Sequence, residues 1–331
     1  MKKLATAIAM TAIAGTPTLA HDRPLGDGKI TSSPRTNYLM SCQQRFNANA
    51  PGAHRTGDWI SGSTYDPAEK PTVDGSVSWP SRISVSLQGN QRVVSANNLP
   101  THTTGNFPIG SNDDAYRYDR NPNRIREQNI VLRLPAEPQL AASPSCVPMG
   151  MIGFALTGVA IYNAVDAAGR DAPAHEIQDK CGGHPQQAGQ YHYHDRSPCL
   201  SDTRSGISGH SDLVGYALDG FGIYGLHGEG GKALTNADLD ACHGHTHTVM
   251  WDGKAREIYH YHLTDQYPYT IGCYRGTPQR VAGLRMANAG ERRGPPQAGD
   301  RQAGGPGMLG DRPPRSGLFG LFRRPPPQGR P

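Results

Sequence analysis

The tetrapeptide Tyr-His-Tyr-His occurs twice in this chain, at residues 191–194 and again at residues 259–262. On an extended strand, alternate side chains point to opposite faces. We therefore expect both histidines of each copy on one face of a strand and both tyrosines on the other. Imidazole is the commonest metal ligand among side chains. Two such strands placed side by side would bring four imidazoles into one small volume.

Each tetrapeptide closes a longer repeat, with copies near residues 150–200 and 212–274. The apolar segment 152–162 matches 214–224 position by position. Both copies then pass through Asp-x-Cys with a histidine three residues after the cysteine, and end in Tyr-His-Tyr-His and another cysteine. Two copies are too few for a solenoid. The pattern predicts a mostly β fold in one domain with an internal duplication, two similar β units about an approximate twofold axis.

The two ends of the chain differ from its middle. Two lysines, a short apolar stretch and Thr-Leu-Ala predict a signal peptide over residues 1–20. Residues 281–331 are rich in Gly, Pro and Arg, which predicts a disordered tail. Between them we expect an irregular N-terminal segment over residues 21–74 and the duplicated domain over residues 75–280.

A signal peptide implies export, and no later apolar run approaches the ~20 residues that a transmembrane helix needs. We therefore expect a periplasmic or extracellular protein. Six cysteines in an exported chain are typical of a disulfide framework, whereas an oxidising compartment disfavours the alternative of thiolate metal ligands. The repeat suggests three pairs: Cys42 with Cys146, Cys181 with Cys199, and Cys242 with Cys273.

The net charge of +5 is misleading for the folded part of the chain. The tail from Arg285 onward holds nine arginines and three acidic residues, so its own balance already exceeds that of the whole chain. The middle is near neutral or slightly acidic and gives no electrostatic case for nucleic-acid binding. The basic tail is suited to contact with an acidic surface.

Local strand signals are clearest before the repeat. Residues 83–87 and 92–96 flank a Gly-Asn turn and predict a hairpin. Residues 130–134 form a short, mostly apolar run that ends at Pro135, as a buried strand would. The helix signal is confined to residues 236–241, with Asn236 as the expected cap.

Several stretches of the chain share their residues with a known family: 95–102, 106–108, 161–163, 179–185, 189–194, 210–212, 220–225, 242–247, 259–262 and 272–274. Over roughly residues 75–276 the chain resembles the YHYH-domain proteins. The resemblance implies an exported protein and no particular activity. Two positions depart from the family. Thr157 stands where Asn is more frequent, and His243 stands where Asn is usual, which adds a candidate ligand.

The repeated histidines are the candidate metal ligands. A pair spaced i, i+2 on a strand separates its Cα atoms by roughly 6.5–7 Å, which two imidazoles can bridge to one ion. Further histidines near the matching turns would complete one or two sites. Nitrogen donors with oxidised cysteines favour Zn(II) or Cu(II). The candidate ligands are His184, His192, His194, His245, His247, His260 and His262.

Asp179 and Asp240 precede the repeated cysteines and are candidates for carboxylates that hold an imidazole tautomer. No phosphate-binding Gly-rich loop precedes a helix, so neither a nucleotide nor an organic cofactor is indicated.

Three functions follow from these residues. The first is an exported protein that holds Zn or Cu. The second is a metal-dependent exported hydrolase or oxidase, with Asp166, Glu176 or Asp219 as a base for metal-bound water. The third is an envelope or surface interaction module whose histidines only pack and form hydrogen bonds. A triad on Ser211 is disfavoured, because its neighbour His210 is adjacent in sequence and no Gly-x-Ser-x-Gly turn exists.

The arrangement of the histidines distinguishes these functions. A closed shell of four histidines favours a binding protein, and an open coordination position favours an enzyme. Histidines that do not converge favour the interaction module.

Overall fold

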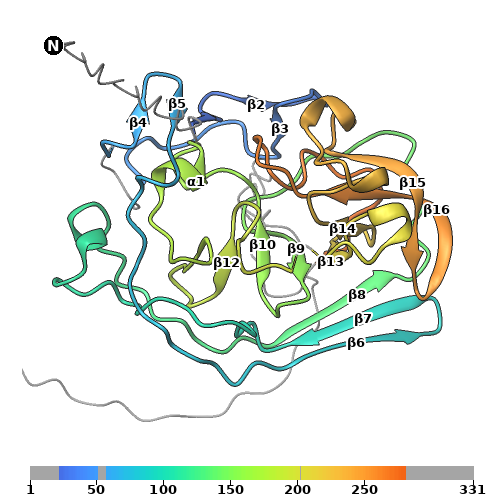
Figure 1. Ribbon diagram of the computed structural model, residues 1–331, viewed down its shortest axis with the longest axis horizontal. Coiled ribbons are helices and arrows are strands. Elements are labelled where there is room, and N and C mark those ends of the chain that lie inside the picture. Colours follow the sequence, from blue (N-terminus) through green and yellow to red (C-terminus); the bar gives the residue numbers. More distant parts are fainter. Residues whose placement is uncertain (1–21, 51–56, 202, 281–331) are drawn as a thin grey trace, which may run out of the picture. The chain divides into compact units, whose positions relative to one another are not determined.

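The computed structural model describes residues 22–50, 57–201 and 203–280, which lie within one compact unit (Figure 1). Strands predominate in this part of the chain, with one four-residue α-helix and short 3-10 turns, so the prediction of a mostly β fold is confirmed. Its helices include none that is long and apolar enough to cross a membrane. The expected signal peptide (1–20) and tail (281–331) lie outside the described residues.

The central element is an eight-stranded sheet in the order β11-β12-β10-β9-β13-β14-β16-β15. Both apolar segments of the repeat lie in it, and strand β9 is buried along its whole length, as expected for a strand covered on both faces. The strands are β9 (Met151–Ala155), β10 (Ala160–Tyr162), β11 (Gly183–Pro185), β12 (Tyr191–Tyr193), β13 (Leu213–Ala217), β14 (Gly222–Tyr224), β15 (Gly244–Trp251) and β16 (Lys254–His262).

Strands β9 and β13 pair antiparallel at the middle of this sheet, with Phe154 opposite Tyr216. The same sequence of pairings follows on each side. On one side, β9 forms an antiparallel hairpin with β10, which pairs parallel with β12. On the other side, β13 forms an antiparallel hairpin with β14, which pairs parallel with β16. An antiparallel edge strand, β11 or β15, completes each side. The two Tyr-His-Tyr-His segments therefore occupy matching places on either side of the β9–β13 junction (Figure 1).

The turns that join β9 to β10 and β13 to β14 each need a glycine. Gly158 and Gly220 both have a positive φ, +84° and +94°, and each donates its N–H to the alanine carbonyl three residues earlier. Any other residue would be strained in this left-handed conformation. The glycine of the repeat is thus a requirement of the hairpin.

A three-stranded sheet, β6 (Ile83–Gln88), β7 (Gln91–Ala96) and β8 (Ile130–Pro135), confirms the predicted hairpin and the strand after it. Strand β8 differs from the prediction in one respect, because its residues alternate between buried and exposed. Leu132 is buried and Val131 is 47% exposed. The strand therefore covers the core with one face, as expected for an antiparallel sheet.

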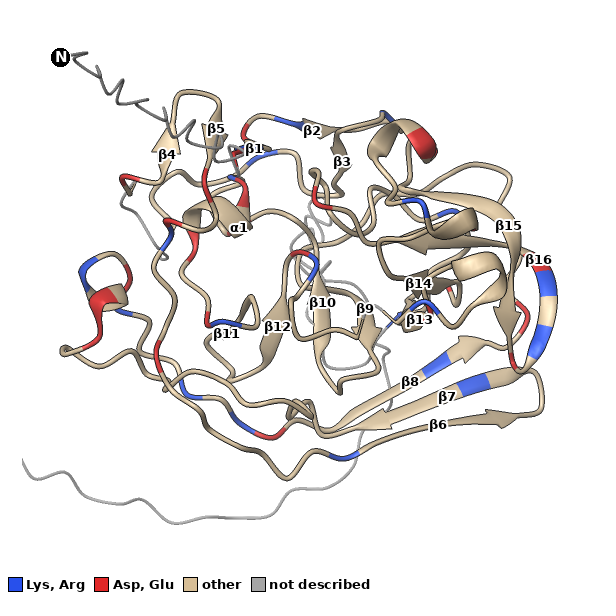
Figure 2. Ribbon diagram, viewed as in Figure 1, with Lys and Arg blue, Asp and Glu red and all other residues tan. Residues whose placement is uncertain are grey.

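Arg92 of β7 joins this sheet to the central one. Arg92 is 2% exposed, and its guanidinium forms a bidentate salt bridge with the Asp252 carboxylate at 2.8 and 2.9 Å. The guanidinium carbon also lies 4.7 Å from the ring centres of Tyr216 and Trp251. Figure 2 shows further basic residues on β8 and β16 nearby. A planar guanidinium suits both kinds of contact, which offset the cost of its burial.

The strands described between Arg23 and Tyr65 are each two residues long. β1 (Arg23–Pro24), β5 (Thr64–Tyr65) and β4 (Ile60–Ser61) form one small sheet, and β2 (Ile30–Thr31) pairs with β3 (Leu39–Met40). Buried Leu39, Trp59 and Tyr65 hold this segment to the rest.

The helical elements are short. They are η1 (Asp114–Arg117), α1 (Ala172–His175), η2 (Ile207–Gly209), η3 (Glu229–Gly231) and η4 (Asn236–Asp238). The helix predicted at residues 236–241 is the single turn η4, and its cap is Thr235 rather than Asn236. Thr235 and Asp238 form a capping box.

All six cysteines form disulfides, and the pairs are the three that were predicted: Cys42–Cys146, Cys181–Cys199 and Cys242–Cys273. No cysteine is free in any described part of the chain. The alternative of thiolate metal ligands is thereby excluded.

Candidate metal centres

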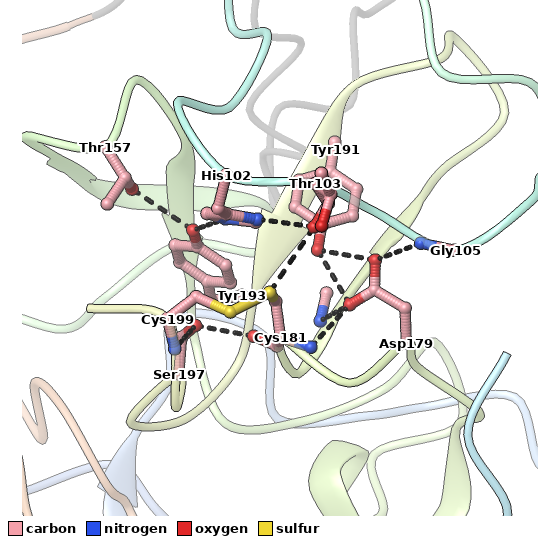
Figure 3. The surroundings of a disulfide bond; sticks show 11 residues. His102, Thr103, Gly105, Thr157, Asp179, Cys181, Tyr191, Tyr193, Ser197 and Cys199 are labelled. Carbon is pink, nitrogen blue, oxygen red and sulfur yellow. Dashed lines mark hydrogen bonds between the residues drawn. A yellow bond between two sulfur atoms is a disulfide. The ribbon is translucent and has the colours of Figure 1, made fainter. Parts of the chain in front are cut away.

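The tyrosines and histidines of each Tyr-His-Tyr-His segment point to opposite sides, as the strand period predicts. On the tyrosine side of β12, the Tyr191 hydroxyl donates to the Asp179 carboxylate at 2.9 Å, and the Tyr193 hydroxyl lies 3.1 Å from Thr157 Oγ1 and 2.5 Å from His102 Nε2 (Figure 3). The Cys181–Cys199 disulfide lies beside them (Figure 3). Thr157 thus has a structural contact with this tyrosine.

The second copy repeats these contacts with different partners. Tyr259 donates to Asp240 at 3.0 Å and Tyr261 to Asp219 at 2.6 Å. Asp179 and Asp240 also accept N–H bonds from the turn that follows each of them. The expectation that these two carboxylates hold imidazole tautomers is therefore wrong, since their described hydrogen bonds go to tyrosines and to the backbone.

On the opposite side of β12, three imidazoles and one carboxylate converge, and we call this group site A. His192 lies on β12, His184 lies directly across from it on β11, and His194 follows β12. Glu176 caps the C-terminal end of α1. The side chains of the three histidines are buried.

Backbone carbonyls determine the tautomers of two of these imidazoles. Nδ1 of His192 lies 3.0 Å from the carbonyl oxygen of Gln190, and Nδ1 of His194 lies 2.5 Å from that of Asn163. A carbonyl only accepts, so both Nδ1 atoms carry a proton, and in the neutral form of each ring Nε2 presents a lone pair. These two Nε2 atoms face each other at 3.1 Å.

The Glu176 carboxylate places a negatively charged oxygen beside these ring nitrogens. Its Oε2 lies 3.3 Å from His184 Nε2 and 3.1 Å from His194 Nε2. Burial raises the pKa of the Glu176 carboxyl, but the nearby His184 and His194 outweigh it and hold the pKa well below its usual range. Burial lowers the pKa of His194, yet Glu176 raises it overall, whereas burial and the adjacent imidazoles lower that of His192.

Four further imidazoles form a second group, which we call site B. His260 and His262 belong to β16, His245 lies across from His260 on β15, and His210 follows η2. The Nε2 atom of His260 lies 3.2 Å from that of His245 and 3.1 Å from that of His262. The four ligand atoms all lie within 4.8 Å of one another.

Site B repeats the arrangement of protons seen at site A. Nδ1 of His260 faces the Ile258 carbonyl at 3.0 Å, that of His262 faces Gly225 at 2.6 Å, and that of His210 faces Ser211 at 2.7 Å. The Nε2 atoms again direct their lone pairs, which can bind a metal, toward the centre of the group.

Burial keeps the site B imidazoles neutral. It lowers the pKa of His245 to about 4, lowers that of His210, and holds those of His260 and His262 well below their usual range. Neutral imidazoles at pH 7 are the form that binds metal.

The spacing of the donor atoms fits one ion in each group. Zinc–nitrogen and zinc–oxygen bonds of about 2.0 Å place tetrahedral ligand atoms ~3.3 Å apart. The contacts between ligand atoms at both sites, 3.1 to 3.3 Å, are close to that edge length. The three histidines of site A, with Glu176 beside two of them, and the four histidines of site B could therefore each hold a metal ion.

The four histidines of the two motifs do not converge on one point. β12 and β16 are five strand positions apart in the sheet order, on the order of 24 Å at the usual strand spacing. The sequence left one or two sites open, and the structure brings these histidines together in two separate groups.

Two expected ligands fall outside these groups. His247 lies on β15, but its Nε2 pairs with Glu229 at 2.9 Å. His243 uses both ring nitrogens in hydrogen bonds, Nδ1 to the His262 carbonyl at 2.8 Å and Nε2 with Asn236 at 2.9 Å. It is therefore a structural residue rather than an extra ligand.

Sequence reasoning missed two members of the sites. The sequence indicates Glu176 only as a candidate base and His210 only as a neighbour of Ser211. Neither lies in a strand of the repeat, so no spacing identified them. The one signal was His210-Ser211-Asp212, a stretch shared with the family that the chain resembles.

A cavity of about 670 Å³ borders site A. His184, His192, His194 and Glu176 contribute to its lining, together with Tyr162 and Val165. Tyr162 stacks on the His192 ring at 3.9 Å between ring centres. The site thus borders a partly open pocket large enough for a small molecule.

Comparison with known proteins gives one match. The model of the family described as YHYH protein matches residues 131–233, which include all of site A and His210 of site B. No curated protein and no solved structure matches the chain. The chain is thus similar to YHYH proteins over these residues, which contain the first of its two Tyr-His-Tyr-His motifs.

Proposed function

We propose that this is an exported protein that binds two transition-metal ions, Zn or Cu, one at site A and one at site B. The observation that carries the proposal is the convergence of Nε2 lone pairs. His192 faces His194, and His260 faces both His245 and His262, at 3.1–3.2 Å, while backbone carbonyls hold the Nδ1 protons of His192, His194, His260 and His262 on the far side.

Purely structural histidines would be arranged differently. A buried acceptor without a donor costs roughly 1–3 kcal/mol. Nδ1 of His184 and Nε2 of His210 are buried without a hydrogen-bond partner, and Oε2 of Glu176 meets the two nearby imidazoles only as an ion pair. A cation at each centre would satisfy these atoms together, whereas packing alone leaves them unpaired.

The donor types favour Zn(II) or Cu(II). Imidazole suits both ions, and the six cysteines, all oxidised, offer no thiolate. Site B offers four nitrogens, and site A offers three nitrogens and one oxygen. The disulfides also support export, because such bonds persist in oxidising compartments.

We further propose that the two halves of the central sheet, around residues 150–200 and 212–274, are copies of one unit. The mirrored strand order, the Phe154–Tyr216 pairing at its centre and one disulfide in each half support this origin. A duplication would explain why each half carries a histidine group, although the fourth donor differs.

Elemental analysis of the protein purified from the exported fraction tests the metal proposal. The variants are His192→Gln with His194→Gln for site A, and His260→Gln with His262→Gln for site B. We expect two equivalents of Zn or Cu in the native protein and one in each variant. His247→Gln, on the same strand as His245 but outside the group, is the matched control and should keep both ions.

The result that would overturn the proposal is equally definite. A folded native protein that contains no Zn or Cu and takes up neither on titration would make the histidines structural. Loss of both ions in the His247→Gln control would show that the readout does not report on the two sites.

A metal-dependent enzyme is the second candidate function. The cavity beside site A favours it, since catalytic metal sites need room for a substrate. Glu176, expected from the sequence as a base, lies among the donors of this site, and Asp166 contributes to the cavity lining. Asp219 instead accepts from Tyr261 on the tyrosine side.

A further inference from the structure

Sites A and B differ in their fourth donor. At site B it is the imidazole of His210, from the segment that precedes β13. At site A it is the carboxylate of Glu176, from the end of α1. A carboxylate can bind through one or both of its oxygens, whereas an imidazole offers one nitrogen. The site with the carboxylate can therefore adjust its coordination more readily.

The surroundings of site A provide space for an additional ligand. The four donor residues share the lining of the 670 Å³ cavity with apolar side chains of Met149, Tyr162 and Val165. This volume lies within the ~300–1,000 Å³ typical of small-molecule sites. A molecule in the cavity would meet an apolar wall and the metal donors at once.

Charge favours an anion in this place. A divalent ion with three neutral imidazoles and one carboxylate retains one positive charge. Arg120, which is exposed, also contributes to the lining. Of the acidic residues in the lining besides Glu176, the buried Asp166 carboxylate is paired with Arg170 at 2.6 Å, and Asp119 is the third.

Tyr162 keeps the donors of site A in a fixed orientation toward the cavity. Its ring stacks on His192 and meets His194 edge-on, and its hydroxyl donates to Gln190 Oε1 at 2.5 Å. Because Gln190 also supplies the carbonyl that holds His192 Nδ1, the tyrosine and the backbone fix one imidazole from two sides.

We propose that the ion at site A binds one further ligand from the cavity, a small organic carboxylate, whereas the ion at site B is held by protein donors alone. This inference rests on the proposed function, since it requires an ion at each site. Site A is then the reactive or ligand-sensing centre of the protein, and site B is a closed centre.

Cobalt(II) spectroscopy separates the two sites. One protein carries His210→Gln and His260→Gln and keeps site A; the other carries His192→Gln and His194→Gln and keeps site B. Each is loaded with Co(II) and titrated with benzoate while its visible absorption is recorded. We expect a saturable loss of band intensity at site A, because four-coordinate Co(II) becomes five-coordinate, and no change at site B.

A cavity variant tests the route of the ligand. Ala167 is exposed and lines the cavity, so Ala167→Trp should narrow it without entering the core. In the site A protein this change should weaken benzoate binding about tenfold or more and leave cobalt binding unchanged. Ala255→Trp, at an exposed alanine of β16 outside the cavity lining, is the matched control and should have no effect.

The outcomes are distinguishable. Cobalt bound at site A without a response to benzoate would overturn this inference and leave the proposed metal binding standing. Equal responses at the two sites would also overturn it. Failure of cobalt to bind either protein would overturn the proposed function and, with it, the inference.

Discussion

At the scale of single residues, backbone carbonyls orient the candidate ligands. His192, His194, His260, His262 and His210 each direct Nδ1 at a carbonyl oxygen. Carboxylates often perform this task at metal sites. A carbonyl adds no charge, and at site B burial keeps the imidazoles neutral. The orientation depends on the path of the backbone rather than on a side chain that a mutation could remove.

His243 leads to a prediction about pH. Burial lowers its pKa to about 4 from a normal 6.5. The unfolded chain therefore binds more protons between these values, and stability from this residue, complete above pH 6.5, falls as pH drops toward 4. Replacement of His243, which has φ +74°, by Asn should remove up to about 3 kcal/mol of that pH dependence. Asn tolerates this left-handed conformation.

Urea unfolding of native and His243→Asn proteins at pH 7, 5.5 and 4.5, both with chelator, measures this effect. The difference in unfolding free energy between the two proteins should shift in favour of the variant as pH falls. A difference that stays constant over this range would contradict the assigned pKa.

At the scale of elements, each site is assembled by strand register and completed by a residue from elsewhere. Antiparallel pairing sets His184 opposite His192 and His245 opposite His260. The period of the strand then adds the second histidine of each motif. At site A the completing residue, Glu176, comes from a four-residue helix too short to be stable alone.

Lys70 holds this helix in place. Its ammonium group donates to the carbonyls of Pro173 and Glu176 and to Gln178 Oε1. Burial lowers its pKa to about 8, so it is still mostly charged at pH 7. We expect Lys70→Met to weaken metal binding at site A about tenfold, because Glu176 loses its support, and to leave site B unchanged.

Competition with a chromophoric chelator gives the affinity of each site in proteins where the other is disabled. Lys232→Met is the control, since this exposed lysine pairs with Asp238 in the other half of the sheet. An unchanged affinity at site A would mean that Glu176 does not depend on Lys70 or does not bind the ion.

At the scale of the whole molecule, the repeat allowed the sequence to predict a large part of the fold. It indicated the β class, the three disulfides and the separation of tyrosines from histidines. The separation follows from the strand period, which is a local property. The distance between the two motifs does not follow from it. That distance depends on the β9–β13 pairing, which places the halves side by side and their histidine strands far apart.

The fourth donors could not be predicted for a related reason. Glu176 and His210 lie in segments without regular period, and they reach their sites through tertiary contacts alone. His243 shows the converse error. Its position beside a repeated cysteine suggested a ligand, but its backbone conformation directs the ring to Asn236 and to the His262 carbonyl.

The separation of the sites leads to the last prediction. A ligand that binds only the folded state adds about 2.7 kcal/mol to the unfolding free energy at one hundred times its dissociation constant. Groups further apart than ~10 Å that share no partner act additively within about 0.5 kcal/mol. We expect the gain from zinc in the native protein to equal the sum of the gains in the two single-site proteins. Urea unfolding is measured with zinc and with chelator on these three proteins and on a fourth that lacks both sites. The four proteins together form a double-mutant cycle. A sum that departs from the native gain by more than about 1 kcal/mol would mean that the β9–β13 junction couples the two sites.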